Sequence, residues 1–199
     1  MSTYPRAALL LSAAQPSHFP ADAGAEAAFA GRSNAGKSSA INALTGRRAL
    51  ARTAKTPGRT RLLNFFELEP GRRIVDLPGY GYAEASAAER ASWAPMIDAL
   101  GARASLRGLF LIVDSRRGLL DGDEALIAWA EGVHCPVHVL LGKSDKLKRA
   151  ELSRALAAAQ RALAGRATVQ AFSAVDGTGL EPARRQLHHW LQEIKGPGG

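Results

Sequence analysis

The sequence predicts an α/β fold, in which a mostly parallel, doubly wound sheet of about six strands carries helices on both faces. The first observation is that short apolar segments alternate with segments of helical periodicity from residue 25 onward. The second is that segments 108–114 and 136–141 are continuous apolar runs, which are typical of parallel strands buried on both faces. The third is length, because 199 residues are enough for one such domain with a proper core.

The elements follow one another along the chain. The predicted strands lie at 25–30, 61–68, 72–76, 108–114, 136–141 and 169–172. The predicted helices lie at 39–44, 86–102, 121–132, 148–163 and 180–194. Gly46 ends the first helix, and Pro70-Gly71 joins the second and third strands as a hairpin. Residues 47–61 are basic and polar and contain Thr56-Pro57-Gly58, which predicts a mobile loop.

The two ends of the chain are expected outside this domain. We interpret residues 1–23 as an N-terminal extension that packs on a domain of residues 24–195, and residues 196–199 as a flexible tail. The segment Arg6–Ala14 resembles a short signal peptide, but it has too few apolar residues to span a membrane. A phosphate-binding loop soon after it would have little use outside the cell. The sequence therefore predicts a cytoplasmic protein without a membrane span.

Charge is distributed unevenly. The formal net charge is +8, and no carboxylate occurs between Glu26 and Glu67. That stretch contains the cations Arg32, Lys37, Arg47, Arg48, Arg52, Lys55, Arg59 and Arg61. Such a stretch suits phosphates of a nucleotide or of RNA, although an Arg- and Ala-rich composition would also raise the net charge.

Cys135 is the single cysteine, which excludes a disulfide within the chain and predicts a small core residue.

The segment Gly31–Ser38 fits the phosphate-binding pattern G-x-x-x-x-G-K-[ST]. Its glycines allow the backbone N–H groups to surround an anion, Lys37 can reach the β- and γ-phosphates, and the Ser38 hydroxyl can ligate Mg²⁺. The alternative is a chance glycine-rich turn. A strand before the loop and a helix after it favour the motif.

Three further motifs follow predicted strands or loops. Asp76-Leu77-Pro78-Gly79 offers a carboxylate that can support Mg²⁺ through water and an N–H that can sense a γ-phosphate, and Thr60 can supply a hydroxyl to the same ion. Lys143-Ser144-Asp145 follows the strand over 136–141. Its carboxylate can accept hydrogen bonds from two guanine donors that adenine lacks, and Ser173-Ala174 can present an N–H to the guanine O6. Each motif is weak alone, and their order carries the prediction.

These motifs in this order resemble the TRAFAC GTPases and, more narrowly, the EngB (YihA/YsxC) family of bacterial ribosome-biogenesis GTP-binding proteins. The similarity extends from about Leu11 to Trp190 and is most specific in the run Asp76–Ala83. The other segments that carry it are 29–39, 56–60 and 64–66. The resemblance implies a single P-loop GTPase domain that hydrolyses GTP. The rival classes are a P-loop small-molecule kinase, which leaves Lys143-Ser144-Asp145 unexplained, and a GTP-dependent septum- or membrane-associated scaffold.

Site residues follow from the motifs and the resemblance. The expected catalytic residues are Asn34, Lys37, Arg59, Thr60 and Gly79. The expected Mg²⁺ ligands are Ser38, Thr60 and Asp76. The expected GTP/GDP contacts are Gly31, Arg32, Ser33, Asn34, Ala35, Gly36, Lys37, Ser38, Gly58, Arg59, Thr60, Arg61, Leu62, Asp76, Leu77, Pro78, Gly79, Lys143, Ser144, Asp145, Lys146, Phe172, Ser173 and Ala174. The family has a polar residue, usually Thr, where this chain has Gly142.

Hydrolysis is expected to be slow, because Tyr80 occupies the position of the water-orienting Gln of Ras-like proteins. Arg59 could compensate, or Asn34 could hold K⁺ where an arginine finger acts; otherwise Asn34 only shapes the loop.

The resemblance implies a partner in the large ribosomal subunit precursor, through rRNA or ribosomal proteins, rather than DNA, and a link to cell division and septation. The oligomeric state is left open. The histidines and the tryptophans Trp93, Trp129 and Trp190 are expected to be structural.

Overall fold

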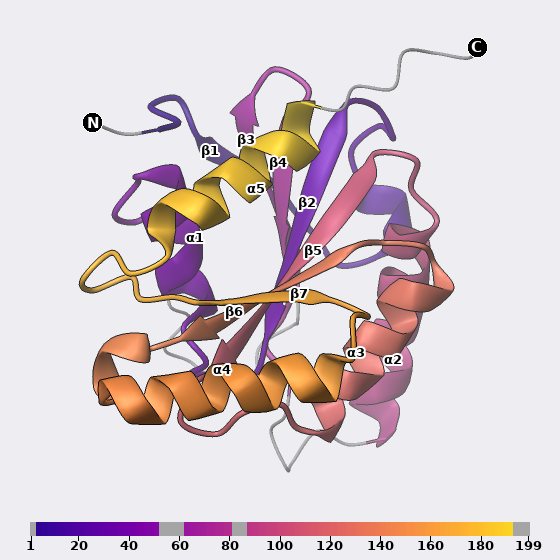
Figure 1. The fold of residues 1–199 in the computed structure, drawn as a ribbon. Helices are drawn as coiled ribbons and strands as arrows, with labels where there is room; N and C mark the ends of the chain where they lie inside the picture. The colour runs from indigo at the N-terminus through magenta and orange to yellow at the C-terminus, as the bar shows by residue number, and fades with distance from the viewer. Residues whose placement is uncertain (1–2, 52–61, 81–86, 193–199) are drawn as a thin grey trace.

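A seven-stranded sheet forms the centre of the computed structural model, which describes residues 3–51, 62–80 and 87–192, without the side chains of residues 87–93 (Figure 1). The strands are β1 Ala8–Ala13, β2 Ala25–Gly31, β3 Leu63–Glu69, β4 Arg72–Asp76, β5 Leu106–Asp114, β6 Val137–Gly142 and β7 Thr168–Ala171. Their order across the sheet is β1-β3-β4-β2-β5-β6-β7. The five strands from β4 to β7 are mutually parallel, while β3 is antiparallel to both neighbours.

Helices cover both faces of the sheet (Figure 1). They are α1 Lys37–Thr45, α2 Ala87–Gly101, α3 Asp121–Gly132, α4 Arg149–Leu163 and α5 Leu180–Gln192, with 3-10 turns η1 Pro16–His18 and η2 Ser144–Lys146. Residues of α2, α3 and α4 pack into one apolar cluster, and residues of α1 and α5 pack into the other. This arrangement confirms the predicted doubly wound α/β fold.

The central strands supply side chains to both clusters in alternation. In β2, Ala28 and Ala30 face the first cluster, while Ala27 and Phe29 face the second. Strand β5 alternates in the same way along its buried residues 109–113. An element buried on both faces must be apolar at every position, which is why these strands appear as continuous apolar runs in the sequence.

The sheet has one strand more than the sequence predicted. Residues 8–13 form β1, which pairs with β3 in antiparallel register, so that Ala13 stands opposite Leu63. The Ser12 hydroxyl also donates to Asn64 Oδ1 at 2.7 Å. Without β1, the outer edge of β3 would expose unpaired backbone groups, which is the physical reason for the extra strand. The N-terminal extension therefore packs on the domain as an edge strand, while the predicted tail at 196–199 lies outside the described residues.

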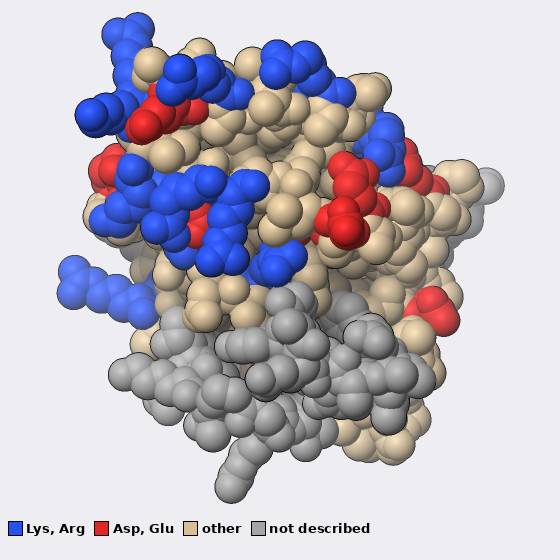
Figure 2. Space-filling view, turned by 90° about the horizontal axis from the view of Figure 1, so that it is seen from below, with Lys and Arg blue, Asp and Glu red and all other residues tan. Residues whose placement is uncertain are grey.

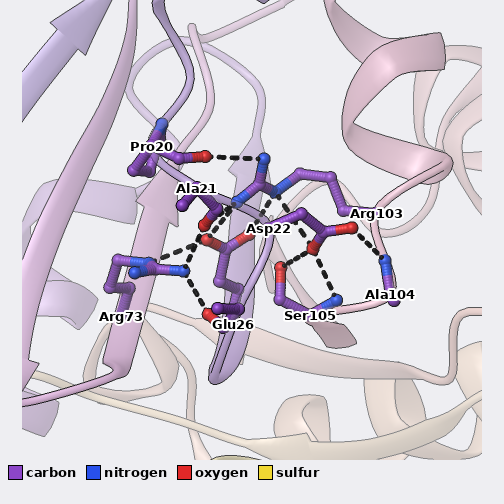
Figure 3. Close-up of polar contacts among 9 residues, drawn as sticks. Pro20, Ala21, Asp22, Glu26, Arg73, Arg103, Ala104 and Ser105 are labelled. Atoms are coloured by element: carbon purple, nitrogen blue, oxygen red, sulfur yellow. Dashed lines mark hydrogen bonds and ion pairs between the residues drawn. The ribbon is translucent and has the colours of Figure 1, made fainter. Parts of the chain in front are cut away.

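A buried ion-pair network fixes the end of the sheet at which β2 begins (Figure 3). The fully buried Glu26 carboxylate accepts from Arg73 Nε at 2.8 Å and from Arg103 Nε and Nη2 at 2.7 and 2.8 Å. The two guanidinium groups also donate to backbone carbonyls of residues 20–23. Asp22 accepts from the N–H groups of residues 104 and 105. The network joins β2, β4, the segment after α2 and the N-terminal segment.

No helix in the described ranges is both long and apolar enough to cross a membrane.

Candidate nucleotide-binding site

The loop between β2 and α1 has the backbone that an anion-binding nest requires. An added Cβ on Gly31 would stand 2.7 Å from the Ile112 carbonyl oxygen of β5, so only glycine fits at the end of β2. Asn34 and Gly36 have positive φ angles of 65° and 108°, and Gly36 is the N-cap of α1. Left-handed residues alternating with right-handed ones turn successive N–H groups toward one point, beside the positive end of the α1 dipole. The predicted strand, loop and helix are thus confirmed.

Lys37, the first residue of α1, forms an ion pair with Asp76, the last residue of β4. Phe29 of β2 is the register partner of Asp76, which places the carboxylate beside the phosphate loop. Burial raises the pKa of Asp76, and the Lys37 ammonium opposes that rise. The ammonium that the sequence predicts to contact phosphates is thus paired with a buried carboxylate in this structure.

Gly79 lies directly against the phosphate loop. The N–H of Leu77 donates to the Phe29 carbonyl at 2.9 Å, and the N–H of Ser33 donates to the Tyr80 carbonyl at 2.9 Å. An added Cβ on Gly79 would stand 2.9 Å from Ser33 Oγ and 3.2 Å from Ser33 Cα. The absence of a side chain thus allows the Gly79 backbone to approach the loop where a γ-phosphate would lie, as expected of a γ-phosphate sensor.

Lys143 connects the end of β6 to the phosphate loop. It has a positive φ of 58°, and its Nζ donates to the Asn34 carbonyl at 2.5 Å and to Asp114 Oδ2 at 3.0 Å. Asp114 also accepts two hydrogen bonds from Arg116, at 2.9 and 2.6 Å. The Arg116 guanidinium, followed by the Lys143 ammonium, holds the pKa of Asp114 well below its usual range. The buried Asp114 carboxylate therefore orients the lysine across the loop.

The base-recognition residues come together from β6 and β7. The Ser173 hydroxyl donates to Asp145 Oδ1 at 2.8 Å, and this bond keeps the pKa of Asp145 below its ordinary value. Ser173 Oγ in turn accepts from the N–H groups of residues 175 and 176. The N–H of Ser144 donates to the Phe172 carbonyl at 3.2 Å, which ties the two loops together. An ionised Asp145 can accept two hydrogen bonds from guanine. The exposed Ala174 follows Ser173 in the loop after β7.

Gly142 ends β6 opposite Asp114 in the register of the sheet. An added Cβ would stand 3.4 Å from the Ala35 carbonyl oxygen and 3.5 Å from Ile112 Cγ2, which are ordinary contacts. The position therefore has room for a Cβ beside the phosphate loop, and the glycine is not imposed by a close backbone approach.

Several predicted site residues lie outside the described ranges: Gly58, Arg59, Thr60 and Arg61. The roles given to Thr60 and Arg59 stay predictions. The remaining predicted residues, Arg32, Ser33, Ala35, Ser38, Leu62, Pro78 and Lys146, lie on the phosphate loop, in α1, before β3, after β4 and in η2. Lys146 forms an ion pair with Asp145 at 3.3 Å.

The Mg²⁺ prediction agrees with the available donors. Ser38 in the first turn of α1 and Asp76 offer only oxygen, which is the ligand type that Mg²⁺ prefers. Among the described residues, no group of three or more His, Cys, Asp or Glu side chains could hold a metal by itself.

Sequence reasoning missed Asp114 and Arg116 as site residues. The available signal was position, because Asp114 is the last residue of a buried parallel strand, at whose carboxyl end ligands bind.

The structure also places two residues that the sequence analysis interpreted as structural, Cys135 and Trp190, in the core. Cys135 is buried, which raises its pKa to about 12, and Trp190 packs on Phe110 with ring centroids 4.7 Å apart. The side chain of Trp93 is outside the described part.

Comparisons with known proteins identify the family. Residues 26–143, more than half of the chain, match a family model described as "50S ribosome-binding GTPase". A probable GTP-binding protein EngB of Coxiella burnetii (strain CbuG_Q212) is 45% identical over 193 residues, covering 95% of this chain and 94% of the relative. The corresponding protein of Pseudoalteromonas atlantica is 47% identical over 195 residues, covering 96% and 95%.

Solved structures agree with this assignment. A crystal structure of a probable GTP-binding protein EngB aligns with a TM-score of 0.65 at 25% identity and covers 85% of this chain and 100% of that one. Era, in complex with MgGDPNP and a segment of 16S ribosomal RNA, shares the fold with a TM-score of 0.63 at 20% identity, covering 89% of this chain and 60% of that one. The phosphate loop, the Asp76–Gly79 segment and the loops after β6 and β7 form the candidate nucleotide site, and the chain belongs to the EngB family of GTP-binding proteins.

Proposed function

We propose that this GTPase is a Mg²⁺-dependent switch that acts in the cytoplasm on the assembling large ribosomal subunit. The observation that carries the proposal is the match to the 50S ribosome-binding GTPase model, which covers the phosphate loop and the guanine lysine. Normal cell division and septation would depend on the protein through its role in ribosome assembly.

Each part of the site has a role in this proposal. Lys37 and the N–H groups of residues 31–38 hold the phosphates, and Asp145 selects guanine. Ser38 and Thr60 would ligate Mg²⁺, and Asp76 would support it through water. When bound, the ion would neutralise charge that develops on the phosphate oxygens. Binding of GTP requires Lys37 to leave Asp76, and the freed carboxylate is then available to the metal shell.

Slow intrinsic hydrolysis follows from the groups around the γ-phosphate. Tyr80 stands where Ras-like proteins carry a water-orienting Gln, and its hydroxyl is already bonded to Asp123. Acceleration would come from Arg59 or from a K⁺ ion held by Asn34. Turnover measured in K⁺ and in Na⁺ distinguishes these two, because equal rates would remove the potassium ion from the mechanism.

The ribosomal partner is supported by charge. The carboxylate-free stretch from residue 27 to residue 66 surrounds the phosphate loop in sequence and carries eight cations. Seen from below, described Lys and Arg side chains gather at the upper left of the molecular face, with acidic side chains among them (Figure 2). Such a surface suits a polyanion, and the family match favours ribosomal RNA or proteins among polyanionic partners.

Co-sedimentation with ribosomal particles tests the proposal. Purified protein is mixed with large-subunit particles in the presence of a GTP analogue, GDP or no nucleotide, across a salt series. We expect binding that requires the GTP analogue and that weakens steeply as salt rises, because neutralised phosphates release counterions. Absence of binding in every state at low salt would remove the ribosomal role and leave the GTPase.

The alternatives predict other outcomes. A septum- or membrane-associated scaffold would bind lipid vesicles rather than ribosomal particles. A small-molecule kinase would bind ATP as well as GTP. Competition by ATP for a bound labelled GDP therefore distinguishes the kinase, because an Asp145 that reads guanine makes ATP a poor competitor.

A further inference from the structure

Tyr80, the residue after the γ-phosphate sensor Gly79, reaches helix α3 with its side chain. Its hydroxyl donates to Asp123 Oδ1 at 2.5 Å. Its ring lies over Gly122, where an added Cβ would stand 3.2 Å from ring atom Cδ2. Asp123 is fully buried, and its other oxygen accepts from the N–H of Leu120, which caps α3. The Tyr80 side chain is thus fixed to the first turn of α3.

The backbone of Tyr80 is fixed on the opposite side, by the phosphate loop. Its N–H donates to the Gly31 carbonyl at 3.4 Å, and its carbonyl accepts from the N–H of Ser33 at 2.9 Å. Arg32 and Tyr80 form an isolated parallel bridge between the two segments. Gly79 is pressed against Ser33 immediately before these attachments. The position of the Gly79 peptide therefore depends on where Tyr80 is held.

We propose that Tyr80 and Asp123 are positioning residues for the γ-phosphate: their hydrogen bond fixes the Gly79 backbone at the phosphate loop and couples it to the N-terminus of α3. Asp123 acts through Tyr80, and Tyr80 acts through the Gly79 peptide. The proposal assigns neither side chain a direct contact with the nucleotide. The inference concerns GTP binding alone and does not depend on the ribosomal partner.

The coupling should affect GTP and GDP differently. In this proposal the Gly79 N–H is the group that meets the γ-phosphate, which GDP lacks. If the Tyr80 hydroxyl is removed, the peptide must be ordered when GTP binds, and that conformational entropy reduces the affinity. GDP binding uses the phosphate loop and the guanine loops, which the change leaves intact. The ratio of the two dissociation constants therefore reports the positioning role.

The experiment compares the Tyr80→Phe variant with the wild-type protein by calorimetric titration in Mg²⁺ buffer. We expect the Kd of a non-hydrolysable GTP analogue to rise about three- to tenfold, within the range of one typical net hydrogen bond, while the Kd of GDP stays within about twofold. Asp123→Ala, which removes the acceptor of the Tyr80 hydroxyl, should change the ratio in the same direction. The double variant should change it no further than the larger single effect, because both substitutions remove one interaction.

Controls separate this role from general destabilisation. Tyr4→Phe removes the hydroxyl of another buried tyrosine, in the N-terminal segment, and should leave both dissociation constants unchanged. An equal loss of affinity for both nucleotides in Tyr80→Phe, or no loss for either, would overturn the proposal.

Hydrogen exchange gives a second readout. Amides 123 and 124 of α3 should differ in protection between the GTP-analogue and GDP states of the wild-type protein, and this difference should be absent in Tyr80→Phe. Equal protection in the two wild-type states would contradict the coupling.

Discussion

At the scale of the residue, the guanine site depends on carboxylates whose charge is maintained by specific neighbours. Asp145 keeps a low pKa because the Ser173 hydroxyl donates to it, and Asp114 keeps a low pKa because it lies between Arg116 and Lys143. Both are therefore ionised at neutral pH. Asp145 is the residue predicted to recognise guanine, and Asp114 holds the lysine that crosses the phosphate loop.

Gly142 offers a test at this scale. Gly142→Thr should lower the Kd of GDP about two- to tenfold, because the added hydroxyl can donate to a loop carbonyl such as that of Ala35 and one net hydrogen bond contributes about 0.5–1.5 kcal/mol. The neighbouring atoms leave ordinary contact distance for the Cβ. Gly142→Ala is the matched control, since it adds the Cβ without the hydroxyl. Calorimetric titration checks both, and equal gains in the two variants would show that packing, rather than the hydroxyl, was responsible.

At the scale of the element, the sheet is fixed at its two ends by different means. At the carboxyl ends of the strands, loops after β2, β4, β5, β6 and β7 carry the residues of the candidate nucleotide site. At the end where β2 begins, the Glu26 carboxylate with Arg73 and Arg103 joins segments that are distant in sequence (Figure 3). Because Glu26 lies in β2 and Arg73 in β4, their ion pair supports the register that places Phe29 opposite Asp76 beside the phosphate loop.

The Glu26 network should contribute strongly to stability. Glu26→Gln removes the carboxylate that bonds to both mostly buried guanidinium groups and leaves Arg103 with the more distant Asp22, at 4.0 Å. Breaking a buried ion pair in this way costs about 3–5 kcal/mol of the free energy of unfolding. Urea denaturation measures the loss. Glu181→Gln is the matched control, because Glu181 pairs with Arg184 on the surface and should change stability by less than about 1 kcal/mol. A loss below 1 kcal/mol for Glu26→Gln would show that the arginines find sufficient partners among the carbonyls.

At the scale of the whole molecule, nucleotide binding and folding are linked. The site is assembled from five loops that meet only in the native sheet, so the unfolded chain cannot bind a nucleotide with comparable affinity. The Lys37–Asp76 pair also shows that the protein can partly satisfy the site's charges before a nucleotide enters. Binding therefore replaces one electrostatic partner by another within an already folded domain.

This linkage predicts a thermal shift. GDP at about one hundred times its Kd should stabilise the native state by about 2.7 kcal/mol, which corresponds to roughly 5–11 °C in Tm for a domain of this size. Differential scanning fluorimetry measures the shift, with ATP at the same concentration as the control. Chelation of Mg²⁺ should reduce the shift with a GTP analogue. A shift with ATP as large as with GDP would contradict guanine selectivity.

The sequence by itself determined the fold class and most of the site. The phosphate loop, its flanking strand and helix, and the order of the motifs are local patterns, and local spacing limits the backbone conformations that a short segment can adopt. The strand bounds around 25–30 and 72–76 and the helix over 121–132 agree with the structure within a residue or two. Parallel strands buried on both faces are mostly apolar, so a continuous apolar run such as 108–114 is recognisable from composition.

The tertiary structure decided what depends on contacts between distant segments. No local pattern pairs Tyr80 with Asp123 or Asp114 with Lys143, because each pair is formed only when the loops after different strands meet at one edge of the sheet. The same reason applies to Glu26, which appears in the sequence as a lone acid in an apolar strand and becomes the partner of two arginines. Strand β1 was missed because its main stabilising partner, the open edge of β3, exists only in the folded sheet.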